Sequence, residues 1–296
     1  MNQEISGIIY KLFNVFCIVL VGLVSKIAMK DLGAFQTFFL SCLSSLIIVS
    51  MILKFQKKQS LVNIIKNISK PFICIAIVNF ASFCTFLYAL KLIDLNVITS
   101  FMYLTPVIVS LLAIFILREK ISLKTILALF ISILGTVIII KPLMVKSAAT
   151  LGIIIALMSA IGWALHDFLL KQQAAKIHWT KQSFMILILC TPLSLPLAIT
   201  TWQPLTHTHI KYILYLGIIY TTNKMLLMKA LANTRLVLLA PISYTKLIFT
   251  AISTYLLFNE VISLTTIMGS TLIIVATILI ACSTKKTPSK SCISIL

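Results

Sequence analysis

The chain has 296 residues, of which 60% are hydrophobic and 10% are charged, and its mean hydropathy is +1.11. Soluble domains usually contain about 45–50% apolar and about 25% charged residues, so this composition excludes a soluble monomer. The formal net charge is +19, which in a soluble protein would suggest a nucleic-acid partner. Here the basic residues stand singly or in short groups between apolar runs, as in membrane-protein loops, and no nucleic-acid partner is predicted.

Ten apolar segments follow one another along the chain, separated by charged clusters. We interpret them as helices because unsatisfied backbone polar groups cannot face lipid and because the alternating pattern of barrel strands is absent. The predicted fold class is an all-α polytopic membrane protein with ten transmembrane helices. The expected spans are 7–25, 33–53, 72–90, 95–117, 122–140, 151–170, 182–200, 211–229, 236–258 and 263–282.

Lysine and arginine residues are distributed unequally between the two sides of these spans. The N-terminal segment, in which Lys11 is counted, the even-numbered loops and the C-terminal tail hold 17 of them, and the odd-numbered loops hold 6. Because loops rich in Lys and Arg stay in the cytoplasm, both termini are predicted to be cytoplasmic. The remaining two, Lys224 and Lys246, lie within spans.

The sequence also repeats itself. Residues 119–126 read EKISLKTI and residues 260–267 read EVISLTTI, which are identical at six of eight positions at an offset of 141. Each copy would contain five spans, an odd number, so the second copy enters the membrane inverted. This predicts two inverted repeats, residues 1–145 and 146–296. Secondary transporters use this plan, with a substrate site between the halves that opens alternately to either side.

Two stretches resemble the EamA family of the drug/metabolite transporter superfamily. They read YLTPVIVSLLAIFILREKIS (103–122) and ALANTRLVLLAPISYTKLIFTAISTYLLFNEVIS (230–263), and each carries a Pro-containing span followed by a Glu. The resemblance implies a ten-helix bundle in the inner membrane of a bacterium that imports or exports small metabolites. The matching positions are Pro106, Glu119, Pro241, Tyr244 and Glu260.

Other segments indicate which group within the superfamily is nearest. The stretches GWALHDFLLKQQA (162–174) and LPLAITTW (195–202) are similar to bacterial members that import S-adenosylmethionine. Small multidrug exporters carry an embedded Glu in their first helix, whereas residues 12–24 contain no acid here. Export of cationic drugs by that mechanism is therefore disfavoured.

Lys246 is the sharpest candidate for a substrate contact. It lies eleven residues past Arg235, which at 1.5 Å per residue places it about 16 Å into a hydrocarbon core about 30 Å thick. Ser243, Thr250 and Ser253 share its helical face, a pattern expected of a water-filled pathway. We expect Lys246 to bind a carboxylate or phosphate. The alternative is a lysine that snorkels or is buried against a neighbour.

Asp167 is the acid that lies well inside a span. It precedes Lys171 by one turn, so an ion pair between them competes with a role in proton coupling, for which His166 is a second candidate. Lys224 could bind substrate or snorkel, and the tyrosines and asparagines could equally serve helix packing. The candidate substrate-binding residues are Lys246, Tyr244, Tyr103, Lys224, Trp163, Asn79, Asn14, Ser243 and Thr250.

These patterns favour a secondary transporter of a small metabolite that bears a carboxylate or phosphate, such as S-adenosylmethionine or an amino acid. An exporter of metabolites or drugs is the alternative, followed by a structural or sensory membrane protein. No enzyme and no cofactor are predicted, because motifs such as HExxH or GxxxxGK[ST] are absent. His207 and His209 lie in an expected loop without nearby acids, so no metal site is predicted. The expected partners are the substrate and the bilayer, and a homodimer stays open.

Overall fold

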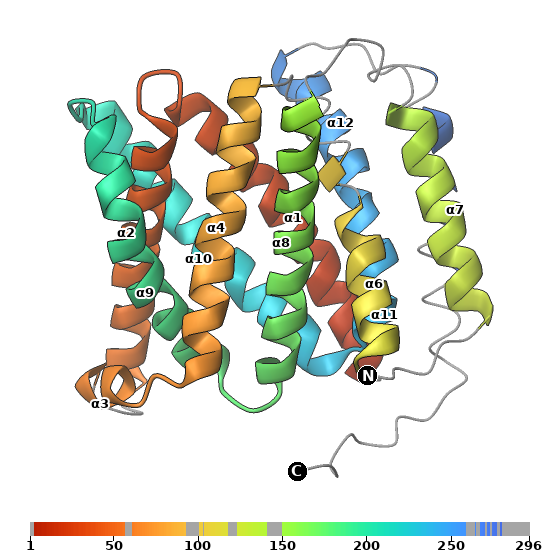
Figure 1. The fold of residues 1–296 in the computed structure, drawn as a ribbon, viewed down its shortest axis with the longest axis horizontal. Helices are drawn as coiled ribbons and strands as arrows, with labels where there is room; N and C mark the ends of the chain where they lie inside the picture. The colour runs from red at the N-terminus through yellow and green to blue at the C-terminus, as the bar shows by residue number, and fades with distance from the viewer. Residues whose placement is uncertain are drawn as a thin grey trace.

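The computed structural model describes residues 3–56, 61–92, 101–102, 104–117, 123–140 and 150–258, with short pieces between 264 and 279. Over these residues the regular structure is helical, without strands (Figure 1). Within the described part of the chain, five helices are long and apolar enough to cross a membrane. They are α1 (Gln3–Ala28), α2 (Ala34–Phe55), α4 (Lys70–Leu92), α8 (Thr150–Ala174) and α9 (Trp179–Thr200).

The remaining helices complete the bundle. α10 runs through 27 residues and carries Lys224, and α3 is a single short helix that the sequence did not predict. Apart from α3, the helices begin and end within several residues of the expected spans wherever the structure describes those ends, and α11 and α12 share the expected span 236–258. The bounds are α3 (Leu61–Lys66), α6 (Thr105–Phe115), α7 (Leu123–Ile140), α10 (His207–Asn233), α11 (Leu236–Ile242) and α12 (Lys246–Phe258).

Large apolar side chains cover the outside of the bundle. Phe13, Phe130 and Leu256 are 59%, 64% and 70% exposed. Water would disfavour so much apolar surface on a soluble protein, whereas lipid solvates it. The exposed apolar faces and the long helices are together consistent with a polytopic membrane protein.

The expected span 236–258 is interrupted in the structure. α11 ends at Ile242, a 3-10 turn follows at Ser243–Thr245, and α12 begins at Lys246. Pro241 lies inside α11, where it cannot donate a backbone hydrogen bond to the carbonyl four residues earlier, and the 3-10 turn begins two residues after it. The expected span is thus helical over its length, with one tighter turn inside it.

The helices pack in pairs that join distant parts of the sequence. α1 lies against α10, α4 against α8, and α2 against α9 (Figure 1). Small residues allow the α4–α8 approach: a Cβ on Gly162 would collide with the hydroxyl of Ser82, and Ser159 donates to the carbonyl of Ser82 at 2.9 Å. The α4–α8 pair thus buries polar groups against a neighbouring helix rather than against lipid.

The pair α1–α10 runs antiparallel. Asp31, which follows α1, contacts His209 in the first turn of α10, while Glu4 at the start of α1 contacts Arg235 just beyond α10. His207 and His209 are therefore helical rather than in a loop. The expectation that no acid lies near them is wrong for His209, because the fold brings Asp31 to it from 178 positions away.

Candidate functional site

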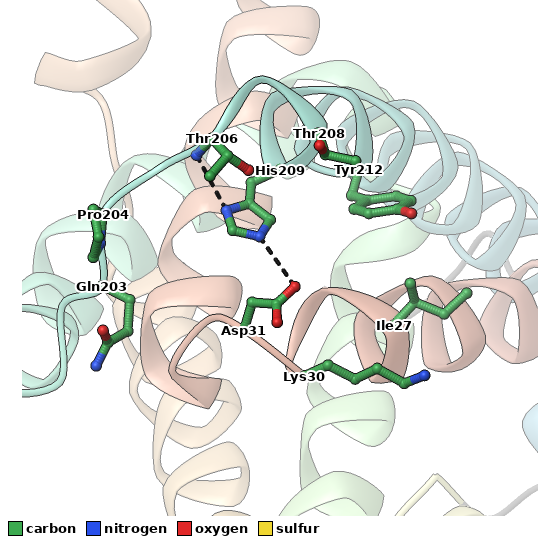
Figure 2. Close-up of a pocket in the computed structure, with 9 residues that line it drawn as sticks. All are labelled: Ile27, Lys30, Asp31, Gln203, Pro204, Thr206, Thr208, His209 and Tyr212. Atoms are coloured by element: carbon green, nitrogen blue, oxygen red, sulfur yellow. Dashed lines mark hydrogen bonds and ion pairs between the residues drawn. The ribbon is translucent and has the colours of Figure 1, made fainter.

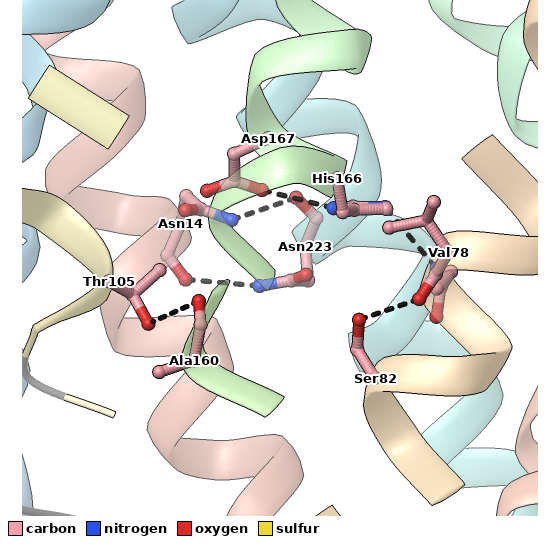
Figure 3. Close-up of polar contacts among 9 residues, drawn as sticks. Asn14, Val78, Ser82, Thr105, Ala160, His166, Asp167 and Asn223 are labelled. Atoms are coloured by element: carbon pink, nitrogen blue, oxygen red, sulfur yellow. Dashed lines mark hydrogen bonds and ion pairs between the residues drawn. The ribbon is translucent and has the colours of Figure 1, made fainter. Parts of the chain in front are cut away.

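Polar side chains from α1, α4, α8 and α10 meet inside the helix bundle. Asn14 on α1 and Asn223 on α10 are buried, and each side-chain amide donates to the backbone carbonyl of the other residue at 3.1 Å. Figure 3 shows this reciprocal pair beside His166 and Asp167 of α8. We call Lys11, Asn14, Asn79, His166, Asp167, Asn223 and Lys224 the central cluster.

His166 connects two members of the central cluster. Its Nε2 lies 3.3 Å from the amide nitrogen of Asn79, and its Nδ1 lies 3.1 Å from Oδ1 of Asp167. Trp163 packs edge-on against the imidazole at 5.6 Å between ring centroids. His166 is 1% exposed, whereas the Asp167 side chain is 26% exposed, so the carboxylate reaches the open side of this chain of contacts.

Positive charge exceeds negative charge around this chain of contacts. Lys11 and Lys224 are buried, at 5% and 6% exposed, and both interact electrostatically with Asp167. Lys224 also lies over the ring of Tyr220, with its Nζ 5.3 Å from the ring centroid. Among the described residues, two buried lysines therefore accompany the one carboxylate of the central cluster.

Two amide oxygens in the central cluster lack hydrogen-bond partners within the described part of the chain. They are Oδ1 of Asn14 and Oδ1 of Asn79, both fully shielded. More than 90% of buried polar groups are hydrogen-bonded in proteins. Acceptors of this kind suit a bound water or a ligand that brings its own N–H or O–H donors. The buried lysines offer the complementary donors to a ligand carboxylate or phosphate.

Polar contacts join α1, α8 and the end of α10 at the end of the bundle that contains the start of α1, and we call them the Glu4 clamp. Arg235 Nε donates to Glu4 Oε1 at 3.0 Å, and the Thr234 hydroxyl donates to the carbonyl of Glu4 at 3.0 Å. Lys171 donates at 2.6 Å to the carbonyls of Leu231 and Thr234. Gly7 permits this approach, because a Cβ there would collide with Thr234.

The structure brings together six of the residues predicted from the sequence: Asn14, Asn79, Trp163, His166, Asp167 and Lys224. The expected ion pair between Asp167 and Lys171 is replaced, since Asp167 pairs with His166 and Lys171 belongs to the Glu4 clamp.

The predicted residues of the ninth span lie at its break. Tyr244 is 1% exposed and packs among apolar side chains, and its hydroxyl has no partner within the described residues. Ser243 and Thr250 donate to carbonyls of their own segment, at 3.3 and 2.8 Å. Lys246 is half-buried at the first position of α12. Tyr103, Glu119 and Glu260 lie outside the described residues.

A model of one protein family matches nearly the whole chain, over residues 5–141 and 150–282. The chain belongs to the EamA-like transporter family. Members of the EamA-like family are transporters rather than enzymes, so the chain is a multi-pass membrane protein of a bacterial transporter family that acts on a small molecule.

Several relatives of this chain have names that state what they transport. The S-adenosylmethionine uptake transporter of Rickettsia prowazekii is 25% identical over 98% of this chain and 97% of the relative, and that of Rickettsia bellii is 27% identical over 90% of each. The pseudopaline exporter CntI of Pseudomonas aeruginosa is 26% identical over 68% of this chain and 70% of the relative. EamA-like relatives of this chain thus include importers and exporters.

A solved crystal structure shares the fold. It superposes with a TM-score of 0.79 at 16% sequence identity and covers 95% of this chain and 99% of the other. This likeness supports the arrangement of the helices in this EamA-like chain and carries no information on its substrate.

Lys11 and Asn223 belong to the central cluster but are not among the residues predicted from the sequence. Lys11 was counted in the N-terminal segment, but α1 begins at Gln3 and places it two turns inside the helix. Its flanking residues are apolar, IIY before it and LF after it, and this context marks a lysine as intramembrane. Asn223 is a polar residue next to Lys224 inside the same expected span, 211–229.

Proposed function

We propose that this protein is a secondary transporter that carries a small metabolite bearing a carboxylate or phosphate across a bacterial inner membrane by alternating access. S-adenosylmethionine and amino acids are the leading substrates. The central cluster is the observation that carries the proposal. Its lysines offer charge-assisted donors to an anionic group, while Asp167 and the two amide oxygens without partners accept from a cationic or N–H-bearing group.

Similarity to relatives supports the choice of S-adenosylmethionine. This metabolite carries a carboxylate, an ammonium group and a sulfonium centre, and so needs both kinds of partner. Both Rickettsia relatives bear its name and align over at least 90% of this chain. His166 and Asp167 are the candidate coupling residues, because these two ionisable groups contact each other inside the bundle and His166 also contacts Asn79.

We further propose ten transmembrane helices in two inverted repeats, 1–145 and 146–296. Support comes from the two stretches matched by the family, 5–141 and 150–282. Helix packing gives a second support. If α1 corresponds to α8 and α4 to α10, the pair α1–α10 maps onto α8–α4, and both pairs are closely packed. Asn79 and Asn223, at an offset of 144, then occupy corresponding helices on either side of the central cluster.

The two ends of the bundle support alternating access. The Glu4 clamp holds α1, α8 and the end of α10 together at one end, and a cavity of about 590 Å³ opens at the other end, where α1 is followed by Asp31. A transporter in one of its two states has one closed and one open end. Given the predicted cytoplasmic N-terminus, the clamp would face the cytoplasm and the cavity would face outwards.

Export is the second candidate, supported by the similarity to the pseudopaline exporter. Import and export are distinguished by vesicles into which the purified protein is reconstituted and whose protein orientation is determined. We expect radiolabelled S-adenosylmethionine to accumulate through protein whose Glu4 end faces the vesicle lumen. Absence of protein-dependent movement in both orientations, with amino acids also tested, would contradict the transporter proposal.

The topology makes a prediction of its own. With cytoplasmic termini, a single cysteine placed at Lys30 is expected to react with a membrane-impermeant maleimide in intact cells, because Lys30 follows the first span. A cysteine at Lys58 should react only after the cells are opened. The reverse pattern would overturn the predicted orientation.

Lys246 is expected to contribute part of the substrate affinity. A charge-assisted hydrogen bond contributes about 1.5–3 kcal/mol, so Lys246→Met should weaken substrate binding roughly 10- to 100-fold while the protein still inserts. Lys246→Arg should rescue binding only in part, because the planar guanidinium needs different room. Equilibrium binding of S-adenosylmethionine to purified protein measures the effect. Unchanged affinity would assign Lys246 a structural role.

A further inference from the structure

A cavity of about 590 Å³ lies at the end of the bundle opposite the Glu4 clamp, where the turn after α1 faces the start of α10 (Figure 2). We call it the mouth cavity. It shares no residue with the central cluster, so the two are separate groups of side chains. Its lining includes Ile27, Lys30, Asp31, Pro204, His209 and Tyr212.

The acidic wall of the mouth cavity is held in place by a buried histidine. His209 is 7% exposed, and its Nδ1 accepts the backbone N–H of Thr206 at 3.2 Å. An imidazole that accepts at Nδ1 carries its hydrogen on Nε2, so Nε2 donates to Oδ2 of Asp31 at 3.3 Å. Figure 2 shows the imidazole between Thr206 and Asp31. The carboxylate of Asp31 is thereby positioned, while its side chain remains 68% exposed.

The opposite wall is fixed as well. Gln36, which is fully buried in α2, donates from Nε2 to the carbonyl of Gln203 at 2.8 Å and accepts the backbone N–H of Gln203 at 2.9 Å. These two bonds fix the position of the backbone beside Pro204, a lining residue of the cavity. Two walls of the mouth cavity are thus built by interactions between distant segments.

The mouth cavity carries charges of both signs. Lys30 and Asp31 are consecutive residues, and both line it. A simple anion near Lys30 would also meet the negative charge of Asp31, and a simple cation near Asp31 would meet the positive charge of Lys30. A molecule that carries both charges offers a partner to each residue. Ile27, Pro204 and Tyr212 supply apolar surface for the remainder of such a molecule.

We propose that the mouth cavity is a separate binding site for the zwitterionic head of an α-amino acid, with the ammonium group at Asp31 and the carboxylate at Lys30. The choice of an amino-acid ligand rests on the proposed function, because a substrate with a zwitterionic amino-acid head would enter through the mouth cavity before it reached the central cluster. The site itself depends only on the residues that line it, and it can be tested without transport.

The experiment places a reporter in the cavity wall. The full chain, labelled with 3-fluorotyrosine and held in detergent micelles, is examined by fluorine NMR, and Tyr212→Phe assigns the Tyr212 resonance. Three probes are titrated: L-methionine, methioninol, which lacks the carboxylate, and 3-(methylthio)propionate, which lacks the ammonium group. We expect L-methionine to shift the Tyr212 resonance saturably, and each of the other two to bind about ten-fold more weakly.

Matched variants identify the charges. Asp31→Asn and Lys30→Met should each weaken L-methionine about ten-fold. Lys176→Met, which removes an exposed lysine after α8, should leave the response unchanged. An unshifted Tyr212 resonance, or equal responses to the three probes, would overturn the proposal, and the comparison of probes on the unmodified chain needs no variant to fold. Lys224→Met should preserve the Tyr212 response. A normal response without transport into vesicles would count against the proposed function alone.

Discussion

Lys224→Met is expected to reduce transport about 100-fold, measured as kcat/KM for S-adenosylmethionine uptake into vesicles. Lys224 is 6% exposed and lies over the ring of Tyr220, so its ammonium has a defined position inside the bundle. Methionine retains most of the side-chain volume but offers no donor to a substrate carboxylate. The expected loss corresponds to the upper end of a charge-assisted hydrogen bond, about 3 kcal/mol.

Stability should not account for this loss. Replacing a buried lysine by an apolar residue removes the cost of burying its charge, so the thermal unfolding temperature should be equal or higher. Lys211→Met, an exposed lysine on the same helix, is the matched control and should retain transport. Lys224→Arg should recover part of the activity. Transport by Lys224→Met at the unmodified rate and affinity would remove Lys224 from the site.

Asp167→Asn is expected to destabilise the protein by about 1–3 kcal/mol, the range for removing a charged hydrogen-bond partner from a buried group. Asp167 is the carboxylate on which Lys11, Lys224 and His166 act, and asparagine keeps its shape while removing the compensating charge. Lys11 and Lys224 then remain buried without the negative charge of Asp167. Thermal unfolding in detergent measures the effect, as a clear decrease in the unfolding temperature.

A second substitution separates charge balance from shape. Asp167→Asn combined with Lys11→Met should regain most of the lost stability, because it removes one of the uncompensated buried charges. Asp167→Asn combined with Lys211→Met removes the same net charge at an exposed position and should regain none. Equal recovery in both double variants, or no loss in the single variant, would show that Asp167 does not balance the central cluster.

Much of the fold follows from the sequence alone because lipid restricts the choices. A long apolar segment must satisfy its backbone hydrogen bonds internally, so α1, α2, α4, α8 and α9 could be predicted with their bounds correct to within several residues. Charged residues inside such segments are costly, and for that reason Asp167 and Lys224 were recognised as candidates from their positions. The resemblance to the EamA family was carried by local motifs and was confirmed by the match to residues 5–141 and 150–282.

Only the tertiary structure decided which polar groups meet. The pairing of Asn14 with Asn223, and of Asp31 with His209, joins residues 209 and 178 positions apart, which no local pattern specifies. Sequence spacing favoured Lys171, one turn further along the helix, as the partner of Asp167. In the folded chain, Lys171 instead donates to two backbone carbonyls where α10 ends, and the adjacent His166 contacts Asp167. Helix ends and helix contacts redistribute hydrogen bonds, so the partner of a polar side chain depends on the packing of the whole bundle.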